Sequence, residues 1–161
     1  MSLLNRRFLF TMPLLLLAAC GFQPVYGPGG SGTALQNAVQ VDAPDDAFSY
    51  TLVREIETRL GRAASPRYAL ALTVDTSQEG LAIDSEDNTT RYNLVGDVDF
   101  ALRNISTGQV VTSGNVENFT GYSATGSTVA TLAAERDAQK RLMVMLAEQL
   151  VTRLYAADLA R

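Results

Sequence analysis

The chain has no histidine, no tryptophan and only one cysteine among its 161 residues. Without histidine, catalytic triads, imidazole acid–base catalysis and the usual zinc sites are excluded. A single cysteine excludes an intramolecular disulfide. No apolar run reaches the roughly 20 residues that a transmembrane helix needs. We therefore expect a protein that is not an enzyme, with no catalytic residue, no metal ion and no cofactor.

The longest apolar run, residues 8–19, follows Arg6 and Arg7 and ends at the cysteine, Cys20. A basic start, a short apolar segment and small residues before a cleavage point are the plan of a secretory signal peptide. The run is too short to cross a bilayer as a helix, and Pro13 within it further disfavours a permanent span. We expect residues 1–19 to be removed from the mature protein.

Residues 17–20, Leu-Ala-Ala-Cys, resemble the lipobox of bacterial lipoproteins. That resemblance implies a diacylglyceryl group and an N-linked acyl chain such as palmitate on Cys20, a far firmer anchor than one myristoyl chain. Gly21, rather than aspartate, follows the cysteine, which in lipoproteins of two-membrane bacteria goes with the outer membrane. The alternative is an ordinary signal peptide that happens to contain a cysteine. The export route, Sec or twin-arginine, stays open.

The expected mature chain is acidic. Loss of Arg6 and Arg7 leaves 11 basic against 17 acidic residues, a net charge of −6. Nucleic acid is therefore not expected as a partner, because phosphate binding needs a basic face. No second long apolar run follows, so we expect a tether at residues 20–33, with a Gly/Ser linker at 28–32, and a single domain at residues 34–161.

Hydrophobic periodicity predicts the elements of this domain. Apolar residues alternate along three segments in the middle of the chain, and they recur at helical spacing before and after these segments. The predicted elements are a strand at 39–41, a helix at about 46–60, strands at about 67–83, 92–102 and 110–122, and a helix at about 127–159. The order β-α-β-β-β-α predicts an α/β (α+β) two-layer sandwich, with two helices on one face of a mixed four-stranded sheet.

Local features refine this prediction. Residues 44–46, Pro-Asp-Asp, supply an N-cap for the first helix, and Glu55 and Arg59 can form an ion pair on its solvent-exposed side. A change of apolar parity after Gly80 indicates a β-bulge. The last helix is longer than ordinary strands cover, so its C-terminal part is expected either to overhang and bind a partner or to fray.

Two groups of carboxylates could suggest chemistry. Asp84, Glu86, Asp87 and Asn88 form an acidic turn, but the spacing of an EF-hand calcium loop is missing. A second group, Glu79, Asp97 and Asp99, could be imagined as a glycosidase pair. Carboxylates on exposed turns and strands are usually only solvated, and we interpret both groups in that way.

The expected mature N-terminus, residues 20–27 (Cys-Gly-Phe-Gln-Pro-Val-Tyr-Gly), resembles that of the LptE family of LPS-assembly lipoproteins, in its alphaproteobacterial form. The predicted order of elements fits the same family. The resemblance implies a non-catalytic outer-membrane lipoprotein that plugs the LptD β-barrel, facing the periplasm and the barrel lumen, and assists LPS delivery to the outer leaflet. A plain reading of residues 22–26 is a tether whose aromatic side chains lie on the domain or the lipid surface.

Three arginines, Arg67, Arg91 and Arg103, have the parity opposite to the apolar face and are expected to point outward. Arg67 and Arg103 should lie near one end of the β-hairpin and Arg91 near the other. Arginine suits bidentate contact with phosphate, so these residues are candidates for LPS binding. The alternative is that they only keep the surface soluble.

Other functions stay open. The chain could be an auxiliary lipoprotein of a phospholipid-transport complex, which would also be an anchored α/β domain without catalytic groups. It could instead be a purely structural envelope lipoprotein. A hydrolase is the most distant alternative.

Overall fold

The structure is a computed structural model that describes residues 25–27, 30–83, 85 and 88–159. Its elements are α2 (Ser31–Leu35), β1 (Val39–Val41), α3 (Ala47–Leu60), β2 (Tyr68–Ile83), β3 (Thr89–Asn104), β4 (Val110–Ser123) and α4 (Thr128–Tyr155). The predicted fold class and the order of strands and main helices are confirmed. The short helix α2 was not expected, because residues 28–32 have the composition of a linker.

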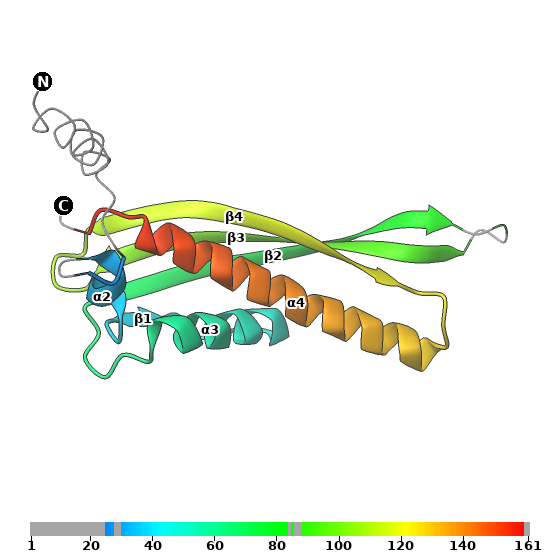
Figure 1. Ribbon diagram of the computed structural model, residues 1–161, viewed down its shortest axis with the longest axis horizontal. Coiled ribbons are helices and arrows are strands. Elements are labelled where there is room, and N and C mark those ends of the chain that lie inside the picture. Colours follow the sequence, from blue (N-terminus) through cyan, green and yellow to red (C-terminus); the bar gives the residue numbers. More distant parts are fainter. Residues whose placement is uncertain (1–24, 28–29, 84, 86–87, 160–161) are drawn as a thin grey trace, which may run out of the picture.

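The strands form one mixed sheet in the order β1-β2-β3-β4, and α3 and α4 cover the same face of it (Figure 1). β1 is parallel to β2, with Val39 beside Tyr68, whereas β2, β3 and β4 are successive antiparallel strands. β1 pairs only with residues 68–70 of β2. β4 is the last strand in the order, so no described strand pairs with its outer edge.

The hairpin of β2 and β3 is the longest feature of the molecule. Each strand has 16 residues, so the hairpin is roughly 50 Å long at about 3.3 Å per residue. The register shifts between Gly80 and Ala82, which confirms the predicted bulge and explains the change of parity. The distal part of the hairpin projects beyond both helices (Figure 1).

Helix α3 has well-defined ends. The Asp46 carboxylate accepts a hydrogen bond from the Ser49 N–H, and the Ser49 side chain accepts one from the Asp46 N–H, which together form a capping box. The helix ends at Gly61, whose φ of 76° is a conformation that glycine adopts without strain. The predicted pair of Glu55 and Arg59 is present, with 3.4 Å between nitrogen and oxygen.

The core lies between the inner face of the sheet and the two long helices. Its fully buried leucine side chains come from every layer: Leu35, Leu52, Leu60, Leu70, Leu102, Leu142, Leu146, Leu150 and Leu154. Helix α4 passes very close to the sheet at Gly96, where a Cβ atom would lie only 2.8 Å from Leu146 Cδ1. The absence of a side chain at Gly96 therefore allows α4 to pack directly on β3.

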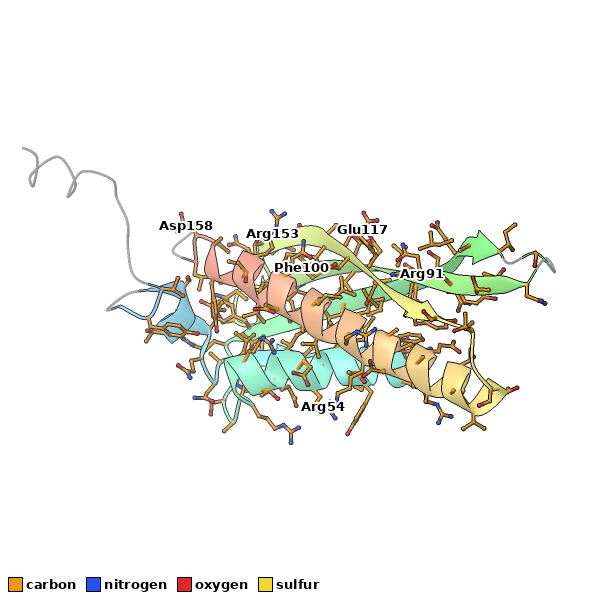
Figure 2. The ribbon with its side chains drawn as sticks, turned by 45° about the vertical axis from the view of Figure 1, so that its right-hand side comes forward. Arg54, Arg91, Phe100, Glu117, Arg153 and Asp158 are labelled. Carbon is orange, nitrogen blue, oxygen red and sulfur yellow. The ribbon has the colours of Figure 1, made fainter. Side chains whose placement is uncertain are left out.

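The expectation for the last helix is wrong about which end is uncovered. Near its C-terminal end, Leu150 and Leu154 are fully buried, whereas Val129 and Leu132 in its first turns are 78% and 44% exposed. The first turns diverge from the hairpin (Figures 1 and 2). The strands are about three times longer than ordinary ones, and they cover the C-terminal half of α4 while its beginning extends past β4.

Candidate functional site

The carboxylates considered for catalysis or calcium binding do not converge on one site. Asp84, Glu86 and Asp87 lie outside the described residues. Glu79 is opposite Asn93, while Asp97 is opposite Asp75, so about four residues of strand, or roughly 13 Å, separate Glu79 from the row of Asp97. In the part of the chain that the structure describes, no three acidic, histidine or cysteine side chains are placed to hold a metal ion.

The outer face of the sheet, away from the helices, carries an acidic row. The register places Asp75, Asp97 and Glu117 directly opposite one another on β2, β3 and β4. Like charges in this arrangement repel one another. The Asn115 amide nitrogen donates to Asp97 Oδ1 at 2.7 Å and to Asp99 Oδ1 at 3.1 Å, and these hydrogen bonds offset part of the repulsion between the carboxylates. The middle of this face is therefore negative, and it disfavours an anionic ligand there.

The three arginines lie as the sequence predicts, at the two ends of the hairpin. Arg103 is opposite Ala69 and Arg91 is opposite Ala82, which places them roughly 40 Å apart along β3. Figure 2 shows Arg91 on the part of β3 that leads to the hairpin tip. The structure therefore does not bring Arg91 into one patch with the other two.

The arginines also differ in their partners. An Nη atom of Arg67 donates to the Ala34 carbonyl oxygen, and its guanidinium carbon lies 5.7 Å from the centre of the Tyr68 ring. An Nη atom of Arg103 donates to the Gly108 carbonyl oxygen at 3.0 Å. Arg91 forms no ion pair or hydrogen bond with the described residues. Among the described residues, the Arg91 guanidinium is thus the one of the three without a hydrogen-bond partner.

Described residues at the end of the N-terminal motif contact the end of α4, and we call this contact the N-terminal clasp (residues 25–27 and 30–35 with Tyr155). The Tyr26 hydroxyl donates to the Tyr155 hydroxyl at 3.1 Å, and the two rings meet edge-to-face with centroids 5.7 Å apart. The Ser31 hydroxyl donates to the Tyr155 carbonyl oxygen, and the Gly32 N–H donates to the Val25 carbonyl oxygen at 3.0 Å. The clasp thus joins residues just after Cys20 to the last turn of the last helix.

The clasp changes the acidity of its central side chain. Burial, followed by the hydrogen bond with Tyr26, raises the pKa of Tyr155 to about 12. The neutral phenol is therefore the form that the folded clasp favours. The sequence analysis did not find this contact, because no local pattern links positions 26 and 155.

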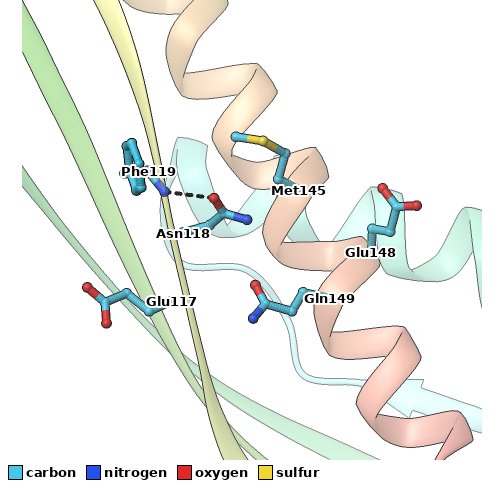
Figure 3. Close-up of a pocket in the computed structure, with 6 residues that line it drawn as sticks. All are labelled: Glu117, Asn118, Phe119, Met145, Glu148 and Gln149. Atoms are coloured by element: carbon cyan, nitrogen blue, oxygen red, sulfur yellow. Dashed lines mark hydrogen bonds between the residues drawn. The ribbon is translucent and has the colours of Figure 1, made fainter.

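A groove runs between the free edge of β4 and the flank of α4 (Figure 3). We call it the β4–α4 groove; it has a volume of about 610 Å³. Its lining residues are Glu117, Asn118 and Phe119 from β4 and Met145, Glu148 and Gln149 from α4. The Phe119 side chain is 65% exposed, although phenylalanine is usually buried. The weak alternation of β4 gave no sequence signal for this groove.

No described helix combines the length and the apolar character that crossing a membrane requires. The family model described as LptE, lipopolysaccharide-assembly, matches residues 36–154. A comparison with curated protein sequences gives no significant match.

Three solved lipoprotein structures share the fold. A putative lipoprotein from Caulobacter crescentus CB15 has a TM-score of 0.66 and 23% identity, and the match covers 78% of this chain and 93% of that one. Lipoprotein B from Nitrosomonas europaea has a TM-score of 0.59 and 15% identity, covering 84% and 91%. The rare lipoprotein B from Shewanella oneidensis has a TM-score of 0.57 and 13% identity, covering 74% and 92%. At these identities the likeness concerns the fold.

Proposed function

Because the chain belongs to the LptE family of lipopolysaccharide-assembly proteins, we propose that it is a non-catalytic outer-membrane lipoprotein that plugs and supports the LptD β-barrel. In this role it assists the assembly and transport of LPS to the outer leaflet. The observation that carries the proposal is the family match over residues 36–154, which includes every described strand, α3 and all of α4 except its last residue.

The shape and surface of the domain support this role. The lumen of an outer-membrane barrel is polar, and the outer face of the sheet presents carboxylate, amide and hydroxyl groups along β2, β3 and β4. The molecule is long and narrow, with the hairpin at one end and the clasp at the other (Figure 1). Such a body can stand along a barrel axis with polar surface against the walls.

The proposed anchor is the lipid on Cys20, which lies outside the described residues. Cys20 precedes Val25 by five residues, so the intervening chain spans at most roughly 18 Å. Since Tyr26 and Ser31 contact the end of α4, an acylated Cys20 would hold the clasp end of the domain close to the bilayer. A short tether of this kind raises the local concentration of the domain near a membrane-embedded partner.

Arg67, Arg91 and Arg103 remain the proposed contacts to LPS phosphates. Arg91 is the strongest of them, because its donors are unused within the described structure, whereas Arg67 and Arg103 already donate to backbone carbonyl oxygens. Arg91→Ala should therefore weaken binding of purified LPS more than Arg103→Ala does. Equal effects of the two variants would contradict this order.

The proposal is tested by affinity purification of the full chain from outer membranes, with the partner identified by mass spectrometry. We expect a large β-barrel to copurify in stoichiometric amount. Copurification of phospholipid-transport components would overturn the proposal and favour the auxiliary-lipoprotein alternative. Unchanged surface LPS after depletion would favour a purely structural lipoprotein.

The anchor has its own test. Mass analysis of the mature N-terminus should find Cys20 acylated, and Cys20→Ser should release the chain from the outer membrane. An unmodified thiol on a chain that still fractionates with the outer membrane would overturn the anchor. The barrel interaction could then still be measured by copurification.

A further inference from the structure

The free edge of β4 has a definite set of outward-facing backbone groups. The Phe119 N–H donates to Oδ1 of the preceding residue, Asn118, at 2.9 Å. The Gly121 carbonyl oxygen accepts a hydrogen bond from an Nη atom of Arg141 at 3.3 Å. In an antiparallel ladder, successive residues turn their backbone groups to opposite sides of the strand. Residues 117, 119 and 121 therefore face away from β3. Side chains, rather than a further strand, occupy the two edge groups at 119 and 121.

Helix α4 extends the other layer past this edge. Met145, Glu148 and Gln149 line the α4 side of the groove, and Figure 3 shows the Asn118 and Gln149 side chains between β4 and the helix. A strand added to β4 would lie about 4.8 Å from it. Its alternate side chains would then contact Met145 and Gln149 on the helix side and the exposed Phe119 ring on the other side. The helical layer thus covers a strand position that no described strand occupies.

The groove also has a chemical preference. The Gln149 Oε1 atom is buried and has no hydrogen-bond partner, so it lacks the donor that buried acceptors normally have. Glu117 and Glu148 stand on the two walls, and neither forms an ion pair with another described residue. An occupant that supplies N–H groups and positive charge would satisfy all three side chains.

We propose that the β4–α4 groove binds an extended peptide segment of a partner protein that carries lysine or arginine and adds to the sheet as a fifth strand. Main-chain hydrogen bonds to the edge, which would replace those that the Asn118 and Arg141 side chains now make there, would give affinity, and the charged walls would give specificity. A second copy of this chain is a poor occupant, because antiparallel pairing of two β4 edges would bring the glutamates of both copies together. The proposal does not depend on the identity of the barrel partner.

Site-specific photo-crosslinking in cells that make the full chain tests the proposal. A diazirine amino acid is placed at Met145 in the groove, and at Tyr50 on the exposed side of α3 as a control. The crosslinked peptides from isolated outer membranes are identified by mass spectrometry. We expect position 145 to capture a single lysine- or arginine-containing segment of one other protein, and position 50 not to capture that segment.

Charge reversal supplies the second measurement. Glu117→Lys combined with Glu148→Lys should lower the yield of that crosslink at least roughly tenfold. Asp75→Lys, a single reversal on an exposed residue two strands away, should leave the yield unchanged; each single glutamate variant should lower it. Both glutamates are exposed, so the thermal unfolding of the double variant should match that of the parent chain.

Several results would overturn the proposal. These are a crosslink from position 145 to a second copy of this chain, to lipid alone, to many unrelated peptides or to nothing, and a yield that charge reversal does not change. If a β-barrel copurifies while position 145 gives one of these results, the docking groove fails and the proposed function stands. If position 145 captures a basic segment and no barrel copurifies, the docking groove stands and the proposed function fails.

Discussion

The close packing of α4 on β3 can be tested at Gly96. A Cβ atom there would lie 2.8 Å from Leu146 Cδ1 and 3.0 Å from Leu142 Cδ2, whereas ordinary contacts are 3.4–4 Å. Both leucines are fully buried, so their tips cannot move into solvent, and either these side chains must repack or the helix must shift. Overpacking of this kind costs about 1–3 kcal/mol. At about 2–4 °C per kcal/mol for a chain of this size, Gly96→Ala should lower Tm by roughly 2–12 °C.

The matched control is Gly121→Ala on the neighbouring strand. A Cβ at Gly121 would meet only Tyr92 O at 3.4 Å and Arg91 Nε at 3.9 Å, which are ordinary contacts. Its Tm should therefore change little. Thermal and urea unfolding followed by circular dichroism would measure both variants.

A compensating substitution isolates the cause. Leu146→Val removes part of the side chain that a Cβ at Gly96 would contact, so the double variant should lose less stability than the two single losses combined. The close-packing explanation would be refuted by strict additivity, or by a Gly96→Ala variant as stable as Gly121→Ala.

Three further predictions concern single side chains. Asp46→Ala should lower the free energy of unfolding by about 0.5–2 kcal/mol. Because hydrogen bonds from Ser49 lower the pKa of Asp46 below 3.8, the contribution of Asp46 should be present above pH 3.8 and vanish as the pH falls through the lowered pKa. Urea unfolding at a series of pH values measures this. Tyr155 has a pKa raised to about 12, so stability should be constant below the ordinary tyrosine pKa of about 10 and fall between about 10 and 12; Tyr155→Phe should reduce that fall. Asn115→Asp replaces the amide that bridges Asp97 and Asp99 with a further carboxylate and should destabilise by about 1 kcal/mol at low salt, with partial recovery at high salt; no salt effect would contradict the repulsion.

The elements that could be predicted from the sequence are those with strong local signals. The period-two spacing of Leu70 and Leu72 predicted the inner face of β2, and the Asp46 cap predicted the start of α3. Parity also placed Arg91 and Arg103 at opposite ends of the hairpin, as the register confirms. These features depend on residues near one another in sequence.

Features that depend on distant segments were missed or wrong. Helical periodicity predicted the last helix but not where the sheet beneath it ends, so the exposure of its first turns was missed; Leu132, for example, is 44% exposed. The pair of Tyr26 and Tyr155 and the groove beside Phe119 each join two elements that carry no shared pattern. The roles of Cys20 and of the three arginines stay predictions.

The clasp has a consequence for how the chain folds. Tyr26 and Tyr155 are 129 positions apart, and synthesis makes the first of them long before the second. Loop closure over such a separation costs entropy before any contact compensates for it. The clasp can therefore form only after the whole hairpin and α4 have been made, so the end of the domain nearest Cys20 becomes rigid last. A truncated chain that stops short of Tyr155 would still carry Cys20, the proposed site of lipid attachment, but could not form the clasp.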